Sequence, residues 1–107
     1  MLEKHHIVFK GQLGLDFELN YKYLTPEEHR GSLGPHLNKK VNIAYKTEME
    51  ANLRRILTKE YYTVEELIEI LGLKEKQAYK AFKRLITIKG VNREDAIFRL
   101  MGNSFYL

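Results

Sequence analysis

The sequence contains no cysteine. That absence excludes disulfides, thiolate nucleophiles and cysteine-based zinc sites, and it fits an intracellular protein. The chain also lacks a run of about eighteen apolar residues, so no membrane span is expected. Its first residues are polar and have no apolar stretch of the kind found in secretory signals. We therefore expect a cytoplasmic protein with no membrane partner.

The composition is that of an ordinary soluble domain, with 107 residues, 44% of them hydrophobic and 30% charged. Lysine and arginine number 18 against 14 acidic residues, a net charge of +4. Residues 74–84 concentrate this surplus, with five basic side chains and one acidic. A local basic helix indicates nucleic acid or another polyanion, although a solvated helix face explains the charge equally well.

Residues 1–40 carry both prolines and four of the seven glycines, a composition typical of strands and loops. Two β-prone runs, at 7–9 and 21–24, predict a hairpin with a long connection. Thr25 and Pro26 then predict a helix start, because threonine caps helices and proline suits their first position.

The rest of the chain predicts helices. Apolar residues spaced by three and four indicate one long helix over 38–60. Three shorter helices follow, the first capped by Thr63 and ended by Gly72, the second over about 75–86, the third capped by Asn92. Residues 88–91 are expected to be a break, too short to form the two-stranded wing of a winged helix. The predicted class is α+β.

All four histidines lie between positions 5 and 36. His5 and His6 are adjacent, Asn20 follows on the second expected strand, and His29 lies in the short helix after it. A hairpin whose second strand carries an asparagine, followed by a short helix that carries a histidine, resembles the HNH nuclease family. The motif of that family folds as a ββα unit around one metal ion. More narrowly, the segment from His5 to His36 looks like small HNH proteins encoded by bacteriophages of Gram-positive hosts.

The resemblance implies a role for each of these residues. His6 is expected to act as the general base that deprotonates water, which a neutral imidazole can do near pH 7. His5 and His29 are expected to bind one divalent metal ion. Asn20 is expected to tie down the loop after His6 and so orient the base. His36 is a candidate third ligand, with a phosphate contact or a plain loop position as open alternatives.

The expected cofactor is one divalent ion: Mn, Co, Ni, Zn or Mg. Imidazole ligands favour the transition ions, whereas Mg prefers oxygen. Asp16, Glu27 and Glu28 are the carboxylates that would change this ranking by adding a ligand. Arg30 is expected to contact a DNA phosphate, with an ordinary surface charge as the alternative. The family resemblance also implies products with 5′-phosphate and 3′-hydroxyl ends.

Residues 64–86 resemble a helix-turn-helix, with Gly72 in the turn. The second helix is expected to present DNA-binding side chains outward, the basic ones toward phosphates or guanine and the amide toward adenine. These are Lys76, Gln77, Lys80, Lys83 and Arg84. A plain helical brace is the alternative, because two amphipathic helices around a glycine are common.

The sequence thus predicts three units: an HNH ββα-metal catalytic unit at 1–40, a connecting helix at 41–60, and a helical DNA-binding unit at 61–107. The expected function is metal-dependent hydrolysis of DNA phosphodiester bonds. The alternative is a non-catalytic helix-turn-helix regulator with a vestigial HNH unit. The apolar stripe of the connecting helix could pack against a second copy of the chain in a homodimer as readily as in an internal core.

Overall fold

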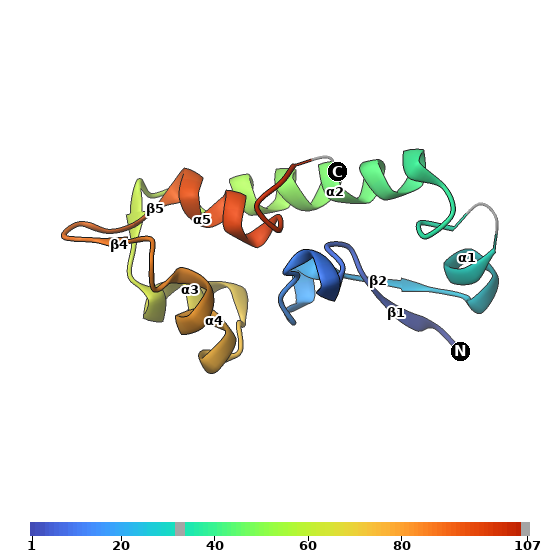
Figure 1. Cartoon of the computed structure of the whole chain (residues 1–107), viewed down its shortest axis with the longest axis horizontal. Helices are drawn as coiled ribbons and strands as arrows, with labels where there is room; N and C mark the ends of the chain where they lie inside the picture. Colours follow the sequence, from blue (N-terminus) through green and yellow to red (C-terminus); the bar gives the residue numbers. More distant parts are fainter. Residues whose placement is uncertain (32–33, 106–107) are drawn as a thin grey trace.

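The computed structural model describes residues 1–31 and 34–105 of an elongated molecule, 47 × 23 × 23 Å in extent. The helix α2 (Lys39–Ile56) runs along one side, with the N-terminal hairpin beside its start and the C-terminal helices beside its end (Figure 1). The expected α+β class is confirmed, because five α-helices accompany two small antiparallel sheets in the described part of the chain. Within the described ranges, no helix has the length and apolar character needed to cross a bilayer.

The N-terminal sheet pairs β1 (Glu3–His6) with β2 (Tyr21–Leu24), placing His6 opposite Tyr21. Two short 3-10 helices, η1 (Lys10–Gln12) and η2 (Glu18–Asn20), lie in the connection. The first strand was expected to include residues 7–9, and this is wrong: regular pairing stops at His6. Ile7 and Val8 leave the sheet and enter the core, where the backbone N–H of each bonds to Asn20.

The predicted helix starts are confirmed at both threonines. Thr25 caps α1 (Pro26–Arg30) in a capping box with Glu28, and Thr63 caps α3 (Val64–Leu71) in the same way with Glu66. Each pair satisfies backbone N–H groups that a helix start otherwise leaves without partners. The long helix, expected to reach residue 60, ends at Ile56, and Leu57 turns away into the core.

The C-terminal unit contains a hairpin that the sequence did not predict. After α4 (Glu75–Phe82), strands β4 (Ile86–Thr87) and β5 (Gly90–Asn92) form a tight antiparallel pair, and α5 (Arg93–Leu100) follows. Strand β3 (Tyr61–Tyr62) completes a sheet in the order β3-β5-β4. The prediction of a plain break at 88–91 is therefore wrong. The order helix, strand, two helices and hairpin is that of a winged helix, and we call the β4–β5 hairpin the wing.

Gly90 makes the wing possible. Its φ of +110° lies in the region that favours glycine, and a Cβ there would come within 2.7 Å of the Tyr62 carbonyl oxygen. The Thr87 hydroxyl donates to the Gly90 carbonyl across the turn at 2.7 Å. Strands of two or three residues suffice because β5 packs between two neighbours.

One continuous apolar cluster joins the two ends of the chain. Val8 and Phe17 enter it from the N-terminal connection, Leu53 from α2, Phe82 from α4 and Ile97 from α5. A forty-residue ββα unit has little core of its own, and no cysteine-bound zinc braces it. The helical unit supplies the missing packing surface.

Candidate metal centre

Three histidines from three parts of the N-terminal unit converge. His5 lies on β1, His29 in the last turn of α1, and His36 in the segment that leads to α2. One ring nitrogen from each lies within 4.8 Å of the other two. The Nε2 atoms of His29 and His36 are 3.1 Å apart. These three side chains are close enough together to hold one metal ion.

Local backbone geometry brings the three rings together. His5 lies in the regular part of β1, opposite Lys22 of β2. The capping box fixes the start of α1 and with it the position of His29 one turn later. Gly34 then lets the chain fold back over that helix: a Cβ at this position would lie 2.4 Å from the Glu28 carbonyl oxygen and 2.8 Å from that of His29. This close approach returns His36 to the other two rings.

The buried ring of His5 has a free nitrogen that could bind a cation. Its side chain is 1% exposed, and burial lowers the pKa of His5 to about 4, with further lowering from the charges of His36, His29 and His6. The ring is therefore neutral at pH 7 and keeps a lone pair. Its Nε2 atom is buried without a hydrogen-bond partner among the described residues. An unpaired buried polar atom costs about 1–3 kcal/mol, and a bound metal ion would remove that cost.

Glu3 orients the second ligand. One carboxylate oxygen lies 2.9 Å from Nδ1 of His29, and the other accepts a hydrogen bond from Arg30 at 2.7 Å. An ionised carboxylate only accepts, so Nδ1 of His29 carries the proton and Nε2 offers its lone pair toward His36. This is the carboxylate–histidine arrangement that commonly supports metal ligands. Arg30, which was expected to contact a DNA phosphate, forms an ion pair with Glu3, and its side chain is 67% exposed.

His6 lies beside the three-histidine cluster in the same cavity. This cavity has a volume of about 220 Å³ and is lined by Lys4, His5, His6, Phe9, Lys10, His29 and His36. Nε2 of His6 is 2.6 Å from an Asp16 carboxylate oxygen. That hydrogen bond, with a second from Gln77, holds the pKa of the Asp16 carboxyl well below its usual range, so Asp16 is anionic.

Asn20 holds the chain that follows His6 in place, although it lies at the end of η2, just before β2, and not on the expected strand. The side chain is fully buried, accepts a hydrogen bond from the Val8 N–H at 2.7 Å, and donates to the carbonyls of Val8 and Leu15 at 3.1 and 2.8 Å. These three bonds use nearly the whole capacity of the amide group. They tie the residues immediately after His6 to the second half of the connection.

The expected DNA-binding residues separate into two groups. Four are exposed on or just after α4: Lys76, Lys80, Lys83 and Arg84. Gln77 is half-buried and faces the N-terminal unit, where its oxygen accepts from the Asp16 N–H at 3.0 Å and its amide donates to the Asp16 carboxylate at 2.8 Å. The prediction that Gln77 points outward with the lysines is therefore wrong. Its bonding groups are satisfied inside the molecule.

Several residues around the centre were not assigned from sequence. Glu3 had a detectable signal, since it lies two positions before His5 and so on the same face of the strand. Lys4 and Lys10 line the cavity and give it positive charge. Asp16 was considered only as a metal ligand. Within the described part of the chain, the metal-competent group contains neither Asp16 nor the carboxylates of α1.

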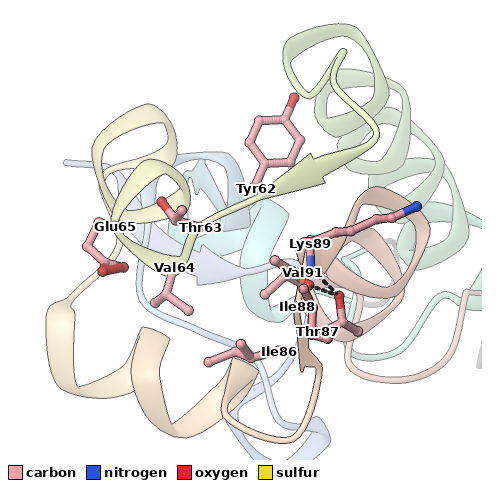
Figure 2. Close-up of a pocket in the computed structure, with 10 residues that line it drawn as sticks. Tyr62, Thr63, Val64, Glu65, Ile86, Thr87, Ile88, Lys89 and Val91 are labelled. Carbon is pink, nitrogen blue, oxygen red and sulfur yellow. Dashed lines mark hydrogen bonds between the residues drawn. The ribbon is translucent and has the colours of Figure 1, made fainter.

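A second hollow lies beside the wing. Figure 2 shows it between the start of α3 and the hairpin, with Val64, Ile86, Thr87 and Val91 among its lining. Its volume is about 310 Å³, and it contains no histidine. Ile88, at the tip of the wing, is fully exposed. This hollow carries no chemistry like that of the histidine cavity.

Comparisons with protein-family models, with curated proteins and with solved structures find no match for this chain.

Proposed function

We propose that this protein is a metal-dependent endonuclease of the HNH type that hydrolyses DNA phosphodiester bonds. The observation that carries the proposal is the histidine cavity: three imidazoles arranged for one ion, and a fourth, His6, bonded to a carboxylate beside them. Hydrolysis of a phosphodiester needs a base, a nucleophilic water and a cation, and this cavity provides places for all three.

In the proposed reaction, His6 takes a proton from a water molecule. The water oxygen forms a bond to phosphorus while the bond from phosphorus to the 3′ oxygen breaks, and that oxygen takes a proton from solvent. A divalent ion held by His5, His29 and His36 would supply positive charge for the phosphate and the leaving oxygen. Lys4 and Lys10, at the edge of the cavity, attract the phosphate backbone. Asn20 keeps the chain after His6 in place.

The second unit supports DNA as the substrate. Lys76, Lys80 and Lys83 are spaced by four and three residues, so they share one exposed face of α4 and its continuation. A helix-turn-helix with a wing and a basic outer helix is an arrangement typical of DNA-binding proteins. The same face supports the alternative function, a DNA-binding regulator in which the histidine cluster holds a structural metal ion without catalysis.

Plasmid cleavage separates the two functions. Chelator-stripped protein is supplied with Mn, Co, Ni, Zn or Mg in turn, and conversion of supercoiled DNA is followed. We expect Mn, Co or Ni to support cleavage at lower concentration than Mg, because the ligands are imidazoles. His6→Ala should lose about 10²- to 10⁴-fold in rate while still binding metal and DNA. DNA binding without cleavage under every metal would establish the regulator instead.

A further inference from the structure

A network of hydrogen bonds connects His6 to the helical unit. One carboxylate oxygen of Asp16 lies 2.6 Å from His6 Nε2, and the other accepts a hydrogen bond from Gln77 Nε2 at 2.8 Å. Gln77 also accepts the backbone N–H of Asp16 at 3.0 Å, so one amide group holds both the backbone and the side chain of this residue. Lys74 of the same helical unit lies 3.6 Å from the carboxylate. Sixty-one residues separate Asp16 from its amide partner.

The chemistry of these groups determines the state of the imidazole. An ionised carboxylate has no proton to donate, so the short contact requires the proton on His6 Nε2. In the neutral ring the lone pair is then on Nδ1, and no described residue forms a hydrogen bond to that atom. A general base needs one fixed tautomer with its lone pair available.

We propose that Gln77 is a positioning residue for the general base: it clamps Asp16, and Asp16 holds His6 with Nε2 protonated and Nδ1 free to take the proton from water. The catalytic part of this inference rests on the proposed nuclease function. Its structural part, the tautomer of His6, does not. The helical unit would then contribute to turnover as well as to DNA binding, because α4 carries both Gln77 and part of the basic face.

The first test replaces Gln77 with alanine in the full-length, metal-loaded protein. We expect kcat to fall about 10- to 100-fold, as for a misplaced catalytic group, with KM for DNA and metal affinity unchanged. Glu75→Gln is the matched control: it changes an exposed side chain on the same helix that does not touch Asp16, and kcat should stay at the wild-type value. A residue that only helped DNA binding would change KM instead.

A pair of complementary substitutions tests the hydrogen bonds themselves. In Asp16→Asn, an amide N–H faces the N–H of Gln77, so neither group can accept a hydrogen bond. In Gln77→Glu, two carboxylates face each other and neither can donate. Each single variant should therefore lose activity. Together they restore the pattern: the asparagine introduced at position 16 accepts from His6 and donates to the glutamate introduced at position 77, which also accepts the backbone N–H of position 16. The double variant should turn over faster than the product of the two single effects allows. Simple additivity would overturn the proposal.

The tautomer is measured without any activity. Nitrogen-15 spectra of histidine-labelled protein distinguish a protonated Nε2 from a protonated Nδ1. We expect His6 of the wild type to show one tautomer, protonated at Nε2, and His6 of Gln77→Ala to show both. Thermal unfolding of each variant verifies that it is folded, and the complementary double variant replaces the alanine variant if that one is not.

The outcomes distinguish the two proposals. Absence of cleavage by the wild type in every metal would refute the nuclease function and leave the tautomer measurement to decide the hydrogen-bond network. Cleavage by the wild type with unchanged kcat and an unchanged His6 tautomer in Gln77→Ala would overturn the positioning role alone.

Discussion

At the scale of single residues, the candidate metal centre depends on neighbours outside its three histidines. Glu3 fixes the ring of His29 through Nδ1, and Asp16 fixes the ring of His6 through Nε2. The two carboxylates act in the same way on two different histidines. Each selects which nitrogen of an imidazole keeps its lone pair.

Glu3→Gln should weaken metal binding. A neutral amide holds the Nδ1 proton of His29 less strongly, and loss of such a supporting carboxylate typically costs about 10- to 100-fold in affinity. Calorimetric titration of the chelator-stripped protein with Zn or Co measures the effect. Glu27→Gln is the control, since it lies exposed on α1 and is not part of the three-histidine group. Equal affinities for the two variants would remove Glu3 from the support of the centre.

The sequence indicated His5 and His29 as a pair of candidate ligands and left His36 open, because all three lie close together along the chain. It could not predict the contact between Asp16 and Gln77, because sixty-one residues separate them and no periodicity reports a tertiary hydrogen bond. The side chains that set the state of His6 are therefore visible as a group only in the folded molecule.

At the scale of elements, the helix starts were predictable, but the wing and the ends of two helices were not. The helices expected to reach residue 60 and about residue 86 end at Ile56 and Phe82. Threonine caps and the Gly72 turn are local signals, and the structure confirms them. The wing strands have two and three residues, too short to show an alternating pattern, and their stability comes from β3 and the Gly90 turn. A long-range sheet partner cannot be detected from the hairpin sequence itself.

The turn of the wing gives a direct test. Gly90→Ala should lower the free energy of unfolding by more than about 1 kcal/mol, because alanine is strained at positive φ and its Cβ meets the Tyr62 carbonyl. Gly11→Ala is the matched control: an added Cβ there has no heavy atom within 4 Å. Denaturant unfolding of both variants measures the difference. Equal stabilities would show that the turn does not need glycine.

The proposed DNA contact of the basic face of α4 predicts that binding depends on salt. Replacing Lys76, Lys80, Lys83 and Arg84 with alanine should flatten the plot of log K against log salt by about 3.6 in slope, since each phosphate contact releases counterions. Removing Lys76 and Lys80 alone should flatten it by about 1.8.

The control for this measurement is Arg55→Ala with Lys59→Ala, which removes two exposed charges at and just after the end of α2, outside α4. Its slope should match the wild type. If the α4 variants also keep the wild-type slope, the helix is a brace and makes no DNA contact.

At the scale of the whole molecule, Asp16 links the stability of both units to pH. Its folded pKa lies below the unfolded value near 3.9, so its contribution is complete above that value and is lost as the pH falls below it. Asp16→Asn should cost about 1.5–3 kcal/mol at pH 7, as for hydrogen bonds to charged groups. The groups that face this carboxylate are His6, Gln77, Lys10, Lys74 and Tyr21.

Denaturant unfolding at pH 7, 5 and 3 tests this assignment. The gap in unfolding free energy between wild type and Asp16→Asn should narrow between pH 5 and pH 3, where the contribution of the wild-type carboxylate begins to be lost. A gap that stays the same at pH 3 would mean that the charge of Asp16 contributes nothing to the stability of the fold.

The shared core also limits how this chain can be rearranged. Val8 and Phe17 pack in the same cluster as Phe82 and Ile97, and the Asp16–Gln77 bonds cross the same boundary. The two ends therefore cannot be exchanged as independent cassettes. A hybrid that joins residues 1–60 to a different helical unit would expose Val8 and Phe17 to solvent. It would also lose the Gln77 hydrogen bonds to Asp16. If α4 contacts DNA as proposed, changing the target would require substitutions on the outer face of α4 within the native chain.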